Sequence, residues 1–251
     1  HKLGEQTAGD VGFTYNLNKY LHFDDRANVL VVQVKNPQQS ATDWYAGSGI
    51  NRNVWLIKKM PITVDDQESY YYTKIKMPHR MDAAPSKRMD DAVAALHQDL
   101  VIDNMGTAAI GDITDAYEKK ELEAQQRRLM LPIQIKTTIY DENNFQVAQK
   151  SGSIKPRPGR QHVVWDLNIT KLKPWSPEQP YLYTWEVELR QGSQVIDRIR
   201  KPLGIRDIRF DTATGFQLNG IPTKMKGVCM SSDWGAMGTA YNYSAMARQL
   251  K

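Results

Sequence analysis

A proline-stiffened segment, WSPEQPYLY at Trp175–Tyr183, constrains the fold of this sequence more than any other stretch. Its two prolines and the adjacent Pro174 fix φ at about −65° and remove backbone donors, so neither a helix nor a central strand can run through them. Apolar and polar side chains then alternate along residues 183–190, which predicts a half-buried strand. A rigid corner that leads into such a strand is typical of a β-sandwich edge.

The alternation assigns each side chain of this strand to a face. The side chains expected in the core are those of Tyr183, Trp185, Val187 and Leu189. The side chains expected on the solvent face are those of Thr184, Glu186, Glu188 and Arg190. Two further tryptophans, Trp55 and Trp165, also lie in apolar patterns and are predicted to be buried.

Composition limits the class of protein. Hydrophobic residues make up 41% and charged residues 24% of the 251 residues, as in a folded globular protein. The sequence contains no apolar run of about 18 residues and no signal peptide, so a membrane span is not predicted. The sequence starts in the middle of a strand-like pattern rather than with Met, so we expect it to be a fragment of a longer protein. The sequence does not predict the cellular compartment, and both a periplasmic and an extracellular parent protein are compatible with it.

The net charge of +5 does not by itself indicate a nucleic-acid partner. Lys and Arg are dispersed, and their densest groups are pairs such as Lys58-Lys59 and Arg127-Arg128, so a solvated surface is the better interpretation. The single cysteine, Cys229, rules out an internal disulfide and a multi-cysteine metal site. We expect it to be buried, because it lies in the apolar run KGVCM.

Three further stretches occur in order around the proline corner. They are DWYAGSGINRNVWL at Asp43–Leu56, GIRDIRF at Gly204–Phe210 and GFQLNGIPTKMKGVCMSSD at Gly215–Asp233. Together with the corner they resemble the family 2 glycoside hydrolases, the β-galactosidase-like enzymes. The resemblance covers roughly the first 60 and the last 120 residues.

The resemblance implies a mainly β fold in three parts. Residues 1–64 would be the C-terminal part of a sugar-binding jelly roll, with strands near Phe13–Leu17 and Val29–Val34. Residues 65–205 would be an immunoglobulin-like β-sandwich. Residues 206–251 would start a catalytic (β/α)8 barrel, with a hairpin at 216–220, a first strand at Lys226–Met230 and a helix at Ser244–Lys251 capped by Asn242.

One part of the sandwich departs from the family pattern. A strand is predicted at Tyr70–Met77, but Lys87–Val101 has apolar residues at helical spacing and Ile113–Met130 is predicted as a second helix, capped by Thr114. We interpret residues 78–130 as a helical insert, either a rearranged surface segment or a separate module. The sandwich pattern resumes at Ile133–Ile139 and continues through strands at 147–150, 163–169 and 195–200.

The resemblance also implies a chemistry. Family members cleave terminal β-glycosides with two glutamates on later barrel strands, so no catalytic residue is expected in this chain. Glu118, Glu121 and Glu123 lie in a charged helix and are predicted to be solvated. Within the motifs, the predicted substrate contacts are the side chains of Asp43, Trp44, Ser231, Ser232 and Asp233. The alternative for Trp44 is burial under its loop, and the alternative for Asp233 is a structural role in which it orders the loop that contains it.

The resemblance implies a carbohydrate substrate as the partner. Neither a nucleic acid nor a membrane is expected as a partner, and a homo-oligomer is compatible with the family. No ligand cluster predicts a metal here, although a metal ion in the full-length enzyme is compatible with the family. By itself the chain is expected to be inactive. The alternative hypothesis is a non-catalytic β-sandwich module that binds carbohydrate or protein. The stretch at 215–233 favours the enzyme, because an isolated sandwich would not continue into the start of a barrel.

Overall fold

The computed structural model of the chain describes residues 1–7, 11–35, 49–50, 52–76, 92–105, 116–230 and 242–250. It divides into two compact units, one made of Leu56–Val228 and the other of His1–Trp55 with Cys229–Lys251. The first of these is mainly β, as the sequence predicts. No helix among the described residues is long and apolar enough to cross a membrane.

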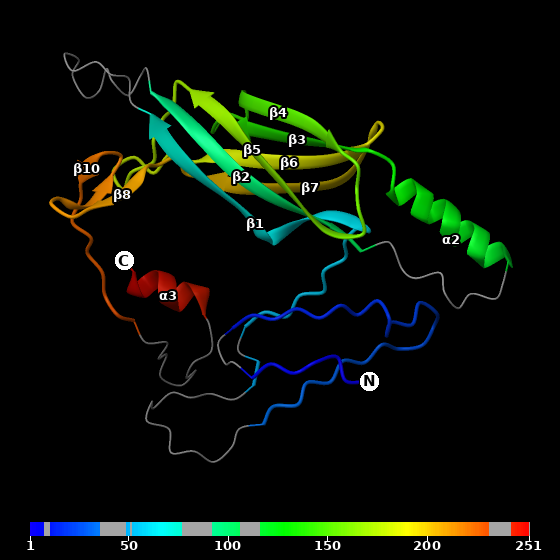
Figure 1. Cartoon of the computed structure of the whole chain (residues 1–251). Coiled ribbons are helices and arrows are strands. Elements are labelled where there is room, and N and C mark those ends of the chain that lie inside the picture. Colours follow the sequence, from blue (N-terminus) through cyan, green and yellow to red (C-terminus); the bar gives the residue numbers. More distant parts are fainter. Residues whose placement is uncertain are drawn as a thin grey trace. The chain divides into compact units, whose positions relative to one another are not determined.

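Two antiparallel sheets form the body of the larger unit (Figure 1). The first sheet has the order β1-β2-β5, with β1 at Ile62–Lys76, β2 at Val93–Asn104 and β5 at Gly159–Thr170. The second has the order β4-β3-β6-β7, with β4 at Gln146–Ile154, β3 at Ile133–Tyr140, β6 at Tyr183–Gln191 and β7 at Gln194–Leu203. This arrangement confirms the predicted β-sandwich.

One hydrophobic cluster lies between the two sheets. It takes Leu96 and Leu100 from β2, and Ile135 and Val187 from β3 and β6, all fully buried. The four side chains that the alternation of β6 assigns to the core are all buried, with Trp185 only 1% exposed. Burial of these large side chains supplies the main driving force for the sandwich.

A buried amide joins the two sheets at their centre. Gln98 of β2 is 0% exposed and donates from Nε2 to Thr137 Oγ1 of β3 at 2.8 Å. Its Oε1 accepts a bond from Trp185 Nε1 of β6, also at 2.8 Å. The bridge therefore pairs the indole N–H and both polar atoms of the amide in the apolar core, where an unpaired polar group would be costly.

The helix predicted at Lys87–Val101 is wrong from Val93 onward, where the chain forms β2. Leu96 and Leu100 are four residues apart, a spacing that fits one face of a helix and equally one face of a strand. The polar Gln98 between them hides the period-two pattern, although it faces inward with its neighbours. β2 is the central strand of its sheet, so the predicted helical insert does not include residues 93–104.

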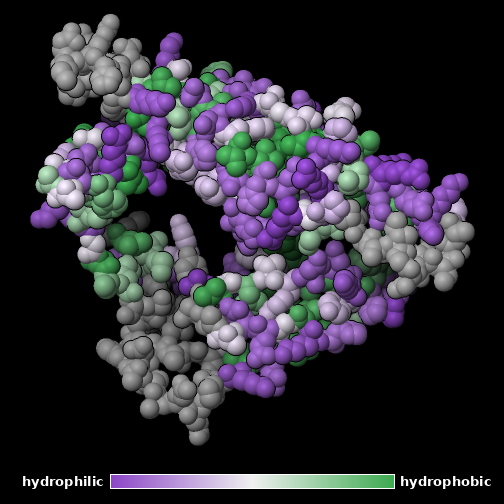
Figure 2. All heavy atoms as spheres, in the orientation of Figure 1, coloured by the Kyte–Doolittle hydropathy of each residue, from purple (hydrophilic) through white to green (hydrophobic). Residues whose placement is uncertain are grey.

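The second predicted helix is present as α2, Ala116–Leu129. Its proposed cap, Thr114, lies outside the described residues. The helix carries Arg127 and Arg128 in its last turn, which suits the negative end of the helix dipole. Figure 2 shows mostly hydrophilic side chains over α2, in agreement with the solvated face that the sequence predicts.

The described residues of the smaller unit contain no strand, so the strands predicted at Phe13–Leu17 and Val29–Val34 are not formed. Val31 is 81% exposed, and the segment has no ladder partner among the described residues. A strand depends on such pairing for its backbone hydrogen bonds. The predicted burial of Trp55 and Cys229 is likewise wrong, because Trp55 is 75% exposed and Cys229 is exposed.

The C-terminal elements agree with the sequence in part. A small sheet of order β10-β9-β8 is formed by Ile221–Pro222, Gly215–Leu218 and Ile208–Asp211. Asn219 and Gly220 make its predicted turn with φ of 53° and 77°. Helix α3, Tyr243–Gln249, is capped as predicted by the Asn242 side chain, which accepts from the Ala245 amide. The strand predicted at Lys226–Met230 is not formed.

Substitution of Gln98 tests the buried bridge. Gln98→Leu leaves the Trp185 N–H and the Thr137 hydroxyl without their partner, and we expect the free energy of unfolding to fall by about 1–3 kcal/mol. Urea denaturation measures the change. Gln149→Leu on the exposed face of β4 is the matched control and should change stability by less than about 0.5 kcal/mol. Equal effects of the two substitutions would contradict the role of the bridge.

Candidate functional site

The substrate contacts predicted from the sequence lie outside the described residues. These are Asp43, Trp44, Ser231, Ser232 and Asp233. Their placement therefore stays a prediction, and the site that the structure does describe is elsewhere in the chain.

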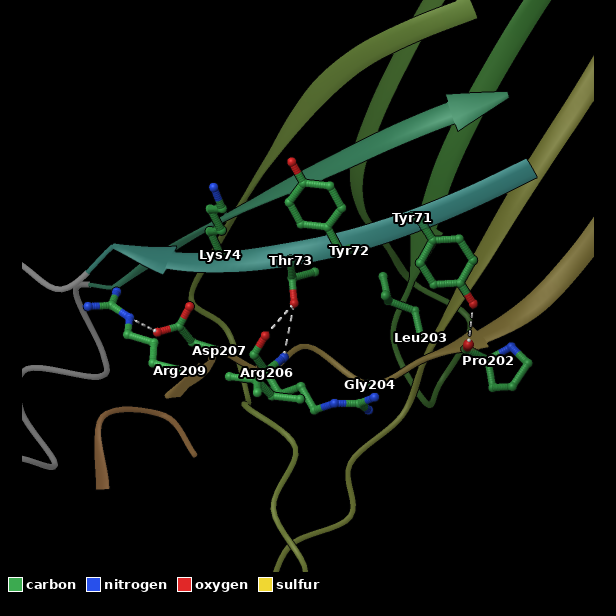
Figure 3. Close-up of a pocket in the computed structure, with 11 residues that line it drawn as sticks. Tyr71, Tyr72, Thr73, Lys74, Pro202, Leu203, Gly204, Arg206, Asp207 and Arg209 are labelled. Atoms are coloured by element: carbon green, nitrogen blue, oxygen red, sulfur yellow. Dashed lines mark hydrogen bonds and ion pairs between the residues drawn. The ribbon is translucent and has the colours of Figure 1, made fainter. Parts of the chain in front are cut away.

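A pocket of about 650 Å³ lies beside β1 of the larger unit (Figure 3). Its walls are Tyr71–Lys74 of β1 and residues of the segment that runs from Pro202 in β7 to Arg209 in β8. Tyr72 and Lys74 lie on one side of the β1 ribbon, and Arg206 and Arg209 lie on the other. The pocket thus spans the edge of β1 that does not pair with β2.

Side-chain hydrogen bonds hold the connecting segment against this edge. The Thr73 hydroxyl donates to the Arg206 carbonyl at 2.7 Å and accepts from the Arg206 amide at 3.1 Å. Tyr71 donates its hydroxyl hydrogen to the Pro202 carbonyl at 2.8 Å. Burial raises the pKa of Tyr71, while the nearby Arg206 charge opposes the shift, so the phenol keeps its proton and remains a donor. Two β1 side chains therefore set the position of the opposite wall.

The proline corner also contacts the segment between β7 and β8. The Trp175 amide donates to the Ile205 carbonyl at 2.8 Å. Gly204 lies so close that an added Cβ would be 3.3 Å from the Trp175 indole ring. Asn219, in the turn between β9 and β10, donates from Nδ2 to the Trp175 carbonyl and accepts from the Asp207 amide. The corner, the connecting segment and the small sheet therefore form one hydrogen-bonded unit.

The pocket carries excess positive charge. Its ionisable walls are Lys74, Arg206, Arg209 and Asp207. Arg209 Nε lies 2.6 Å from Asp207 Oδ2, so these two charges compensate. Arg206 stacks 5.4 Å from the Trp175 ring centroid, and Lys74 Nζ lies 5.7 Å from that of Tyr72. Neither cation forms an ion pair with a carboxylate in the described part of the chain. This arrangement can bind an anion.

The structure corrects the prediction for two glutamates of β6. Glu186 and Glu188 are only 7% and 5% exposed, although the sequence predicts the solvent face for both. Arg198 and Arg190 donate to Glu188 at 2.9 and 3.2 Å through their Nε atoms, and Arg200 Nε lies 3.2 Å from Glu186 Oε2. The arginine side chains cover the outer face of this central strand and exclude water from it.

Arginine contacts make Glu188 unsuited to act as the general acid of glycoside cleavage. Burial raises the pKa of Glu188, but hydrogen bonds from Arg198 and Arg190 outweigh that effect, and the pKa lies below its ordinary value of 4.5. A general acid needs the opposite shift, so that it holds a proton near neutral pH. The cluster is therefore structural. Among the described residues no group of three or more His, Cys, Asp or Glu side chains could hold a metal ion.

The pocket residues were not among the sequence-based candidates. Arg206 and Arg209 belong to the GIRDIRF motif, but their spacing alone does not distinguish a surface arginine from a pocket wall. Tyr72 and Lys74 are more than a hundred residues distant in sequence from that motif and meet it only in the fold. A signal was present in Gly204, whose lack of a side chain permits the close approach to Trp175.

Comparisons with known proteins agree with the motifs. The family model for glycosyl hydrolases family 2 matches residues 116–206. A β-galactosidase of Bacteroides ovatus is 32% identical over 99% of this chain, and a β-glucuronidase of Formosa agariphila is 24% identical over 95%. A crystal structure of a family 2 glycosyl hydrolase of Bacteroides cellulosilyticus superposes with a TM-score of 0.63 at 27% identity over 82% of the chain.

The chain spans about a quarter of the length of these relatives. It covers 25% of the Bacteroides ovatus protein, 23% of the Formosa agariphila protein and 24% of the crystallised protein. The comparisons thus concern only that part of each relative.

The Glu188 cluster predicts a pH dependence of stability. Because the folded pKa is below the ordinary value, this group stabilises the fold above about pH 4.5, and the contribution is lost as the pH falls through the folded pKa. We expect Glu188→Gln to lower the free energy of unfolding at neutral pH and to flatten its fall towards about pH 3. Urea denaturation across this range measures both effects. Exposed Glu178→Gln is the control, and an identical pH profile in the two variants would refute the assignment.

Proposed function

Because this chain belongs to glycosyl hydrolase family 2, we propose that it is part of an enzyme that cleaves terminal β-galactosides or related β-glycosides. The observation that carries the proposal is the similarity along 99% of the chain to a protein named a β-galactosidase. Other relatives are named β-glucuronidases, so the proposal includes related β-glycosides beside β-galactosides. The substrate class is a carbohydrate.

The proposed reaction proceeds with retention of configuration. A glutamate nucleophile would attack the anomeric carbon while a second glutamate protonates the leaving oxygen, and water would then release the glycosyl group. Both glutamates are proposed to lie outside this chain. In support of this, the adjacent buried glutamates of the described sandwich are held by arginines, and Asp207 in the pocket is paired with Arg209.

Within this scheme the chain contributes substrate contacts rather than the reacting groups. Asp233 would accept a hydrogen bond from a sugar hydroxyl, and Ser231 and Ser232 would exchange hydrogen bonds with neighbouring hydroxyls. Asp43 and Trp44 would lie at the entrance, where the indole could stack on a sugar ring. These residues belong to the motifs on which the family resemblance rests.

A second candidate function is a non-catalytic module that binds carbohydrate or protein. The observation that favours it is the cationic pocket, which is complete within the sandwich unit. The two functions differ in whether any longer form of the protein turns over a glycoside.

Hydrolysis of chromogenic β-galactosides and β-glucuronides tests the enzyme. We expect turnover by the protein extended through a complete (β/α)8 barrel and none by the 251-residue chain, because the two glutamates are proposed to lie in the added part. Turnover by the short chain would mean that an active carboxylate pair lies within it. If neither form hydrolyses any β-glycoside, the result would favour the binding module.

The proposed contacts of Asp233 are tested in the extended protein. Asp233→Ala removes a hydrogen bond to substrate, and we expect kcat/KM to fall by about tenfold or more. Steady-state kinetics measure the change, and an unaltered unfolding temperature serves as the check on folding. Ser231→Ala should have a smaller effect, since a neutral hydroxyl forms a weaker hydrogen bond than a carboxylate. An unchanged kcat/KM in Asp233→Ala would assign Asp233 to loop structure.

A further inference from the structure

We propose that the pocket beside β1 binds an acidic oligosaccharide, one that carries uronate carboxylates. The anion-binding part of this inference rests on the pocket itself, and the saccharide class rests on the proposed function. The pocket volume of about 650 Å³ is within the range of small-molecule sites, which is about 300–1,000 Å³.

The first argument is that Arg206 is positioned but not neutralised. Its backbone is fixed by the two hydrogen bonds with Thr73, and its guanidinium stacks on Trp175. No carboxylate among the described residues pairs with it. A guanidinium held in this way pays little conformational entropy on binding, and its planar fork matches the two oxygens of a carboxylate.

The second argument is that an aromatic ring and a cation lie next to each other on one side of β1. Tyr72 is 43% exposed and lies beside Lys74, which also lacks an ion-pair partner in the described ranges. An exposed ring can pack against the C–H face of a sugar, while the ammonium group attracts an acidic substituent. Since Arg206 and Lys74 lie on opposite sides of β1, the geometry favours a chain of several sugars over a single one (Figure 3).

The third argument distinguishes a uronate chain from a polyphosphate such as a nucleic acid. A nucleic-acid site requires a continuous cationic track along closely spaced phosphates. Here the Asp207 carboxylate lies within the row of cations and neutralises Arg209. Isolated cations separated by a carboxylate and by tyrosine side chains suit a ligand whose anionic groups are separated by hydroxyls.

Calorimetric titration of the 251-residue chain with trigalacturonate tests the inference. We expect binding that weakens as salt is raised, and a weaker or absent signal with neutral galactotriose. Arg206→Gln and Lys74→Gln should each reduce the affinity by about tenfold, as one charge-assisted contact is lost in each. Tyr72→Ala should reduce it as well, whereas Tyr72→Phe should not, because the ring is retained.

Arg157→Gln is the matched control, since this exposed arginine lies between β4 and β5 and outside the pocket. Its affinity should equal that of the unsubstituted chain. Unfolding temperatures verify that each variant is folded, and Arg206→Gln keeps the backbone bonds to Thr73. Equal affinity of the pocket variants and the control would overturn the assignment.

The choice of ligand is tested separately. Tighter binding of galactotriose, of a sulfated trisaccharide or of a single-stranded oligonucleotide than of trigalacturonate would overturn the uronate class. The hydrolysis assay of the extended protein is independent of these titrations. A failed titration with successful hydrolysis would therefore reject the pocket ligand alone, and the reverse result would reject the enzyme and retain the anion site.

Discussion

The sandwich depends on the amide of Gln98, which links both sheets through the middle of the core. Hydrophobic burial would hold the sheets together in several registers, because apolar contacts are not directional. The bonds to Thr137 and Trp185 each form in one register only, as both partners are buried and fixed on the opposite sheet. The amide therefore selects the alignment that the surrounding leucines and isoleucines then stabilise. The edges of the sandwich follow from this alignment, including the contact of β1 with β7.

The segment after β7 converts that alignment into a pocket. Its residues alternate in burial, with Leu203, Ile205 and Asp207 buried and Arg206 exposed between them. Ile205 belongs to the core cluster, so the neighbouring Arg206 is placed at the pocket wall by the packing of the residue before it. The proline corner reinforces this through the Trp175 amide, which bonds to the Ile205 carbonyl. The same short stretch of backbone, around Ile205 and Arg206, therefore determines both the core packing and the pocket geometry.

The sequence predicted the sandwich well wherever one period was unambiguous, as along β3 and β6, and it predicted the hairpin turn after β9 from Asn219-Gly220. It failed at β2, because Leu96 and Leu100 fit both periods and only the partner sheet makes an inward glutamine favourable. It also failed for Glu186 and Glu188, whose burial depends on arginines from the neighbouring β7. The pocket could not be predicted, since Tyr72 and Arg206 meet through tertiary contacts that no local pattern encodes. The five sequence-predicted substrate contacts stay predictions, because they lie outside the described residues.

A comparison of the arginines shows why the pocket is more than a surface feature. Arg198 and Arg200 are each matched to a buried glutamate, and their charge serves the fold by allowing β6 to be covered on both faces. Arg206 is held just as firmly, by backbone bonds and by the Trp175 ring, yet no described carboxylate uses its charge. The hydrogen bonds that fix the Arg206 backbone do not involve the charge of its guanidinium. A fixed charge without a structural partner is the condition for a preorganised anion contact, because a ligand carboxylate would complete the pairing at little cost in entropy.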